Sequence, residues 1–143
     1  MKKVFLLIII LISFSCSDNT LVNNCFSNLS FDELVDLSNP EFNAILTPGN
    51  HVITNEGGRN ILIIHRGTTP KYKAFDLQCP ERNCNSPMTF DGLFLKCSCD
   101  DVRYNSLSGC PVNNEGQCKN DNTCFALEYT VREISQTSLQ ITR

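Results

Sequence analysis

The sequence predicts an all-β fold, a small antiparallel sandwich or barrel. Short apolar runs rich in β-branched residues recur along the chain, and Pro-Gly, Gly-Gly and Asp-Gly pairs separate them. The 143 residues suffice for one domain with a single modest core. The formal net charge is -3 and neither sign runs in blocks, so there is no electrostatic reason to expect a nucleic-acid partner.

Residues 1–15 have the layout of a secretory signal peptide. Two lysines supply the positive start, and the nine apolar residues 4–12 are too few to span a bilayer stably. Cys16 follows a small residue, which resembles the bacterial lipobox, where the cysteine is lipidated and becomes the mature N-terminus. We therefore expect lipidation at Cys16 and a polar tether over residues 16–29, which would hold the protein on a membrane without a spanning helix. A plain signal peptide with a chance cysteine is the alternative.

The folded domain is expected over residues 30–143, and its first element is ambiguous. The run from Ser30 to Glu33 has the form of a capping box that opens a short helix. Alternate residues from Phe31 to Leu37 fit one face of a strand equally well. We expect a strand, and Pro40 ends either element.

The rest of the chain has a consistently β pattern. Thr47-Pro48-Gly49-Asn50 suits a type II turn, with Pro at the second position and Gly at the third. Gly57-Gly58 and Asp91-Gly92 each predict a hairpin, because both pairs tolerate the positive φ angles of a tight turn. Residues 108–123 are rich in Gly, Asn and Cys and predict a long loop. The predicted strands are residues 51–54, 61–65, 72–75, 88–90, 93–95, 102–104, 125–134 and 139–142.

Nine cysteines determine how the rest of the sequence is interpreted. Apart from Cys16 eight remain, and in an oxidising compartment an even number indicates disulfides first. In the cytosol the same spacings would suggest a metal. Four of them lie in two loops, residues 79–84 and 97–104, each of which follows a predicted strand. We expect the two loops side by side, where they could build a metal site or two disulfides.

The first loop reads C-P-E-R-N-C and the second reads C-S-C-D-D-V-R-Y. Here the sequence resembles the Rieske family, whose loops read C-x-H-x-x-C and C-x-C-H-G-S-x-[YF]. In that family the first cysteine and the histidine of each loop hold a 2Fe–2S cluster, and the other two cysteines form a disulfide. The resemblance covers roughly residues 45 to 143 and implies a sandwich or barrel of Rieske type with a two-loop cysteine subdomain. The chain is also similar to exported Rieske-like lipoproteins of Bacteroidetes-type bacteria, which often lack the histidines.

The resemblance places the cluster cysteines on Cys79 and Cys97 and the bridging disulfide on Cys84 and Cys99. That bridge would close a loop of about 16 residues, which the chain-entropy model values at roughly 3 kcal/mol. Without a cluster, Cys79 and Cys97 would face each other in an oxidising compartment, where they could pair as a second bridge. The remaining cysteines allow three pairings, and we expect at least one bridge to staple the 108–123 loop. They are Cys25, Cys110, Cys118 and Cys124.

The two cluster-histidine positions fall on Glu81 and Asp100. Imidazole ligands lower the negative charge of a Rieske cluster and raise its potential, whereas carboxylates add charge and suit harder ions. With Asp101 these carboxylates form an acidic trio that could bind a hard cation, although solvated turn residues are the simpler interpretation. The histidines of the chain, His51 and His65, fall on predicted strands outside the loops and are interpreted as surface or strand-face residues.

Three functional hypotheses follow. We expect an exported, membrane-anchored lipoprotein, periplasmic or outer-membrane, with a degenerate Rieske-like domain stapled by disulfides. It would bind no cluster and would act as a scaffold or binding module, not as an enzyme. The alternative is an electron-transfer protein whose 2Fe–2S cluster is held by Cys79, Cys97 and carboxylates, or by all four loop cysteines. The third is a zinc or thiol-redox site on the same cysteines.

Overall fold

The computed structural model describes residues 24–81, 84–119 and 123–143. The predicted signal peptide and Cys16 lie outside the described residues. Among the described residues, no helix is long and apolar enough to cross a membrane. The elements are two short 3-10 helices, η1 (Asn24–Phe26) and η2 (Pro40–Leu46), and the strands β1 (Asp32–Asp36), β2 (His51–Glu56), β3 (Arg59–His65), β4 (Tyr72–Asp76), β5 (Thr89–Phe90), β6 (Phe94–Lys96), β7 (Arg103–Asn105), β8 (Glu128–Ser135) and β9 (Ser138–Thr142).

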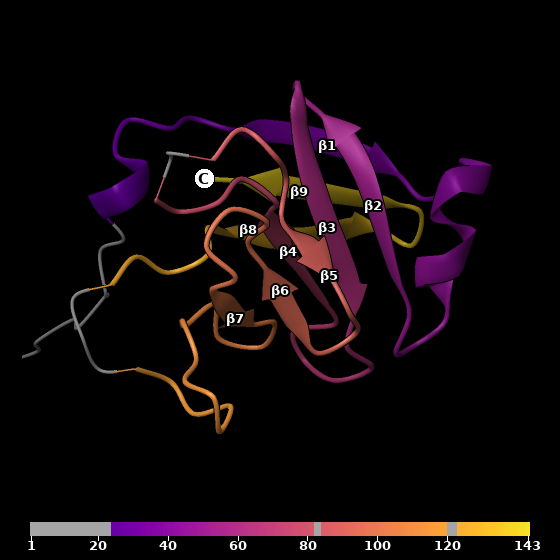
Figure 1. The fold of residues 1–143 in the computed structure, drawn as a ribbon. Helices are drawn as coiled ribbons and strands as arrows, with labels where there is room; N and C mark the ends of the chain where they lie inside the picture. Colours follow the sequence, from indigo (N-terminus) through magenta and orange to yellow (C-terminus); the bar gives the residue numbers. More distant parts are fainter. Residues whose placement is uncertain (1–23, 82–83, 120–122) are drawn as a thin grey trace, which may run out of the picture.

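The strands form two antiparallel sheets, which confirms the predicted fold class (Figure 1). The larger sheet has the order β1-β9-β8-β4-β3-β2, and the smaller has the order β5-β6-β7. Every strand pair is antiparallel. The small sheet and the loops around it form the predicted cysteine subdomain, beside β3 and β4.

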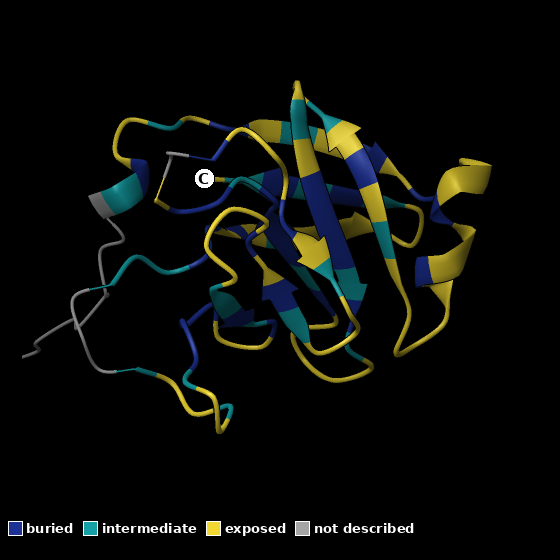
Figure 2. Ribbon diagram, viewed as in Figure 1, coloured by how far each residue is buried: buried dark blue, intermediate teal, exposed yellow. Residues whose placement is uncertain are grey.

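Strands β3 and β4 are buried on both faces, because the large sheet has a core on each side of them (Figure 2). Ile61 and Ile63 of β3 enter one core together with residues of β1, β9 and η2. Leu62, between them, enters the other core, which the cysteine subdomain covers. Successive side chains of a strand point to opposite faces, so one apolar run serves both cores. The central strands thereby connect the subdomain to the rest of the domain through packing on both faces.

Local turn chemistry accounts for the hairpins. Gly57 and Gly58 both have positive φ angles, 54° and 76°, and Glu56 pairs directly with Arg59 across this two-residue turn. In the β5–β6 turn, Asp91 Oδ1 accepts hydrogen bonds from the backbone N–H groups of Leu93, at 2.9 Å, and of Phe94, at 2.7 Å. Strand β6 therefore begins at Phe94, one residue later than predicted. Both predicted hairpins are confirmed.

The N-terminal part of the domain differs from expectation in two ways. The strand predicted after Ser30 is confirmed as β1. Pro40 was expected only to end that first element, but it is the first residue of the helix η2. Proline suits the first turn of a helix, where its missing N–H has no partner, and Phe42 and Ile45 of η2 are buried. Residues 24–29, expected in a polar tether, belong to the folded domain, because Phe26 is buried in the first core.

Candidate functional site

The cysteine loops extend from the ends of two strands that lie close together. The first loop follows β4, and the second follows β6. The backbone N–H of Met88 donates to the carbonyl of Leu77 at 2.6 Å, which ties the entrance of β5 to the exit of β4. The N–H of Cys97 donates to the carbonyl of Val102 at 2.9 Å and closes the second loop on itself. The loops therefore lie side by side, as expected.

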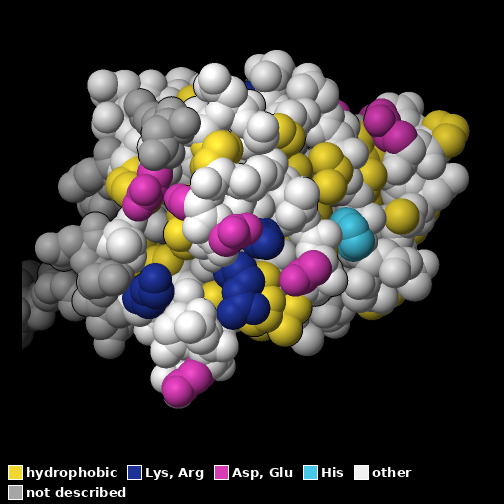
Figure 3. Space-filling view, viewed as in Figure 1, with side chains coloured by type: hydrophobic (Ala, Val, Ile, Leu, Met, Phe, Trp, Pro, Cys, Tyr) yellow, Lys and Arg dark blue, Asp and Glu magenta, His cyan; other side chains and the backbone are white. Residues whose placement is uncertain are grey.

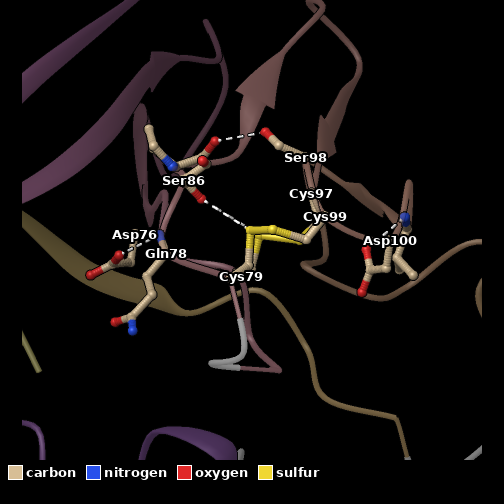
Figure 4. The surroundings of a disulfide bond; sticks show 11 residues. Asp76, Gln78, Cys79, Ser86, Cys97, Ser98, Cys99 and Asp100 are labelled. Atoms are coloured by element: carbon tan, nitrogen blue, oxygen red, sulfur yellow. Dashed lines mark hydrogen bonds between the residues drawn. A yellow bond between two sulfur atoms is a disulfide. The ribbon is translucent and has the colours of Figure 1, made fainter.

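Two disulfides join the loops, and Figure 4 shows the surroundings of the bridge at Cys79. Cys79 is bonded to Cys97 with their Cα atoms 5.6 Å apart, and Cys84 is bonded to Cys99 with their Cα atoms 5.8 Å apart. Both separations lie in the ordinary range for disulfides. The pair that the Rieske resemblance assigns to a bridge is bridged, and the pair that it assigns to cluster ligation is bridged as well.

The two bridges are close to each other but differ in accessibility. The Sγ atoms of Cys79, Cys84 and Cys97 all lie within 4.8 Å of one another, and these three residues are buried. Cys99 is exposed. The carbonyl oxygen of Ser86 lies 3.5 Å from Cys84 Sγ. The inner Cys79–Cys97 bridge is therefore shielded from solvent, whereas the outer Cys84–Cys99 bridge has one exposed end.

The residues at the cluster-histidine positions are both exposed. The Asp100 carboxylate accepts a hydrogen bond of 3.0 Å from the backbone N–H of Val102, so it stabilises the turn of its own loop (Figure 4). The pKa of Tyr104 is raised above the ordinary tyrosine value, mainly by burial and further by the negative charges of Asp100 and Glu81. Both carboxylates are exposed, and they act on the buried Tyr104 hydroxyl only through their charge.

The third member of the acidic trio has a partner of its own. Asp101 forms an ion pair with Lys96 at 2.7 Å, and this hydrogen-bonded contact lowers the pKa of the Asp101 carboxyl. On the face that carries β5–β7, acidic and basic side chains are interspersed (Figure 3). The described residues therefore do not gather the trio into a cation site.

The donor set does not fit a Rieske cluster. Such a cluster takes two thiolates and two imidazoles from its loops. Here the two sulfurs at the thiolate positions are bonded to each other, and exposed carboxylates stand at the imidazole positions. His51 is exposed on β2, and His65 is buried at the end of β3 against Tyr72, so each stands on its predicted strand. Neither belongs to a cysteine loop.

The other cysteines staple the ends of the chain and the long loop. Cys110 is bonded to Cys118, so one bridge closes part of the 108–123 loop, as expected. Cys25 is bonded to Cys124, and the two lie 99 positions apart in sequence. All eight cysteines of the described residues are therefore paired.

A buried ionic network beside the loops was missed by the sequence analysis. Asp76 ends β4 and is 2% exposed, and its Oδ2 accepts hydrogen bonds from Arg59 Nε and from the Tyr129 hydroxyl. Its Oδ1 accepts a hydrogen bond of 2.7 Å from the N–H of Gln78, and Arg59 Nη2 donates to Gln78 Oε1 at 2.8 Å. An acidic residue directly after the apolar pair Ala74-Phe75 was the available signal. The network holds the backbone at the point where the first cysteine loop begins.

A cavity of about 240 Å³ adjoins this network and the outer bridge. Arg59, Asp76 and Gln78 supply its charged and amide groups, and Cys84 of the outer bridge also lines it. Asn85 and Ser86 of the first loop complete one side. The first cysteine loop and the residues that follow it therefore form one wall of a polar cavity.

No family model matches the chain, and no curated protein matches it. Among solved structures, the chain is similar to the ferredoxin of carbazole 1,9a-dioxygenase from Nocardioides aromaticivorans IC177. The identity is 15% and the TM-score is 0.42, over 66% of this chain and 86% of that chain.

Proposed function

We propose that the chain is an exported cell-envelope protein whose Rieske-like domain is closed by disulfides and acts as a scaffold or binding module. One observation carries the proposal. The Sγ atoms of Cys79 and Cys97 are bonded to each other, so the two sulfurs that a Rieske cluster needs are already used. The inner bridge then supports the loops from within, as the cluster would in an electron carrier.

The surroundings of the loops support a binding role. The polar cavity beside Cys84 presents a guanidinium, a carboxylate and an amide, held in place by the network around Asp76. Such preorganised groups at the wall of a concavity are typical of a recognition site. In this proposal the disulfides stabilise the wall of the cavity and take no part in chemistry.

Export and anchoring are part of the same proposal. Four disulfides among the described residues suit an oxidising compartment, where such bonds persist. The leader-like residues 1–15 and Cys16 would supply the route and the lipid anchor. Fractionation tests this part, because Cys16→Ser should release the protein from the membrane fraction and abolish incorporation of labelled fatty acid. A variant Cys16→Ser that stays membrane-bound would contradict the lipid anchor.

The central experiment is to measure iron, acid-labile sulfide and free thiols in protein produced with its leader and purified in air. We expect no iron, no visible iron–sulfur absorption, and no reactive thiol among Cys79, Cys84, Cys97 and Cys99 after denaturation without reductant. Cys79→Ser/Cys97→Ser is the matched variant, and its metal content should equal that of the unmodified protein. Stoichiometric iron and sulfide that this variant loses would overturn the proposal.

A second candidate function is electron transfer by a 2Fe–2S cluster with unusual ligands. The observation that favours it is the mutual approach of the Sγ atoms of Cys79, Cys84 and Cys97 within 4.8 Å. Four thiolates commonly hold such a cluster, but they must then be reduced. The same iron, sulfide and thiol measurements separate the two candidates, because a cluster requires thiolates and the proposed scaffold requires disulfides.

A further inference from the structure

The large sheet has two edge strands, β2 at one end of its strand order and β1 at the other. An edge strand presents a row of backbone N–H and C=O groups that can pair with another strand, so proteins commonly protect such edges with charged residues, proline or bulges. The two edges can be compared residue by residue, because each strand pairs in regular register with its single neighbour.

The outward backbone groups of β2 belong to His51, Ile53 and Asn55. The N–H of His65 donates to the carbonyl of Asn50 at 2.9 Å, which sets the alternation of the ladder between β2 and β3. Hydrogen-bonded and non-hydrogen-bonded pairs alternate along antiparallel strands, so every second residue from position 52 bonds to β3 and the residues between point their amides away. Within residues 24–81, 84–119 and 123–143, no strand lies on that side of β2.

The side chains of this edge do little to protect it. Ile53 is the central one of the three outward residues and is 50% exposed. The strand contains no proline and no lysine, and its ladder with β3 has no bulge. Its acidic residue is Glu56, at the very end, where the carboxylate accepts a hydrogen bond of 2.9 Å from Thr54. Figure 3 shows hydrophobic side chains gathered near β2. This edge therefore presents an apolar centre and open backbone groups together.

The opposite edge is protected by charge. The N–H of Arg143 donates to the carbonyl of Phe31 at 2.9 Å, so the outward residues of β1 are Asp32, Leu34 and Asp36 by the same alternation. At 66%, Leu34 is more exposed than its counterpart on β2. A second copy that paired antiparallel about Leu34 would nevertheless place Asp32 opposite Asp36, and like charges directly opposite each other are destabilising. The β1 edge therefore disfavours pairing with itself.

We propose that β2 pairs antiparallel with β2 of a second copy of this chain, about a two-fold axis at Ile53. Each Ile53 then lies opposite its own counterpart, His51 lies opposite Asn55, and Glu56 lies opposite Asn50. No carboxylate faces another, every outward N–H meets a carbonyl, and the two sheets become one continuous sheet. This strand is thus complementary to itself. The inference goes beyond the scaffold role, and it holds whether the cysteine loops carry disulfides or a cluster.

Disulfide trapping with the purified full chain tests this pairing. In an antiparallel hydrogen-bonded pair the Cα atoms lie about 5.5 Å apart, a separation that suits a disulfide. The variant Ile53→Cys should therefore form a covalent dimer on mild oxidation, seen on a non-reducing gel and abolished by reductant. Leu34→Cys is the matched control, because it places a more exposed thiol at the centre of the charge-protected edge. It should stay monomeric at the same protein concentration.

Further variants check the register and the strength of the dimer. His51→Cys and Asn55→Cys should cross-link when they are mixed, whereas each alone should not, because identical positions then lie about 14 Å apart. Ile53→Asp places two like charges opposite each other and should weaken the dimer at least about tenfold in sedimentation equilibrium. Leu34→Asp should leave the association unchanged.

Several outcomes would overturn the proposal. They are an unmodified chain that stays monomeric, equal cross-linking of Ile53→Cys and Leu34→Cys, and equal weakening by Ile53→Asp and Leu34→Asp. Oxidation of Ile53→Cys in intact cells tests for a different occupant, and a product that joins this chain to another protein would also overturn it. If Ile53→Cys fails to fold, the mixed His51→Cys and Asn55→Cys pair decides the question.

Discussion

The hydroxyl of Tyr129 donates a hydrogen bond of 2.5 Å to Oδ2 of Asp76, although the two residues are 53 positions apart in sequence. Arg59 Nε donates to the same oxygen and to the Tyr129 hydroxyl, the latter at 3.1 Å. The pairing of β4 with β8 and of β3 with β4 brings the three residues together. A carboxylate that is 2% exposed is thereby hydrogen-bonded and neutralised, which is the condition under which such a charge is tolerated in a core.

Loss of the Tyr129 hydroxyl should destabilise the domain. Tyr129→Phe removes one hydrogen bond to a buried charged group, and we expect the free energy of unfolding to fall by about 1.5–3 kcal/mol. Urea unfolding followed by circular dichroism measures it. Tyr104→Phe is the matched control, because its ring is equally buried while Asp100 and Glu81 act on its hydroxyl only through their charges. Equal losses of unfolding free energy in the two variants would show that the hydrogen bond from Tyr129 to Asp76 makes no additional contribution to stability.

The same two tyrosines predict a loss of stability at alkaline pH. Burial raises the pKa of both hydroxyls above the value of about 10 found in unfolded chains. The unfolded chain therefore releases these protons first, so the contribution of each neutral phenol is complete below about pH 10 and is lost as the pH rises toward the folded-state pKa.

Urea unfolding midpoints at about pH 8 and about pH 11 check this. The midpoint should be lower at the higher pH, and this decrease should be smaller in Tyr104→Phe and in Tyr129→Phe than in the unmodified protein. A midpoint that does not change, or a fall that both variants retain in full, would contradict the assignment to these hydroxyls.

The disulfides should rank by the length of chain that each closes. Cys25–Cys124 spans 99 residues, whereas Cys84–Cys99 spans 15. The chain-entropy model values loops of this size at about 4.7 and about 3 kcal/mol, so Cys25→Ser/Cys124→Ser should cost about 2 kcal/mol more than Cys84→Ser/Cys99→Ser. Guanidinium unfolding of the two double variants gives the comparison. The reverse order would mean that native-state contacts of the loops outweigh chain entropy.

The two loop disulfides should be reduced in a defined order. A thiolate must reach a sulfur to attack it, and Cys99 is exposed while Cys79 and Cys97 are buried. Under limiting reductant we therefore expect Cys84 and Cys99 to be alkylated first, with the inner bridge intact. Mass spectrometry of peptides alkylated before and after full reduction measures the order. Simultaneous labelling of both pairs would instead indicate exchange among the three close sulfurs, or opening of the whole subdomain.

The local parts of the fold were predictable because short stretches of sequence specify them. Gly57-Gly58 adopts the two-residue turn that its positive φ angles allow, and Asp91 caps the second hairpin through its own side chain. The helix η2 was missed, because Pro40 was interpreted only as a stop, although proline also suits the first turn of a helix. The start of β8 was placed at residue 125 but lies at Glu128.

The candidate site also has one part that the sequence determines and another that only the tertiary structure decides. The sequence by itself determined that four cysteines would lie in two adjacent loops and that carboxylates would stand where a Rieske cluster needs imidazoles, because cysteine spacing and residue identity are properties of the chain. Only the tertiary structure decided that Cys25 pairs with Cys124 and that Arg59 and Tyr129 meet at Asp76. Each of these depends on strands that are remote in sequence, and packing of the whole sheet brings them within contact distance.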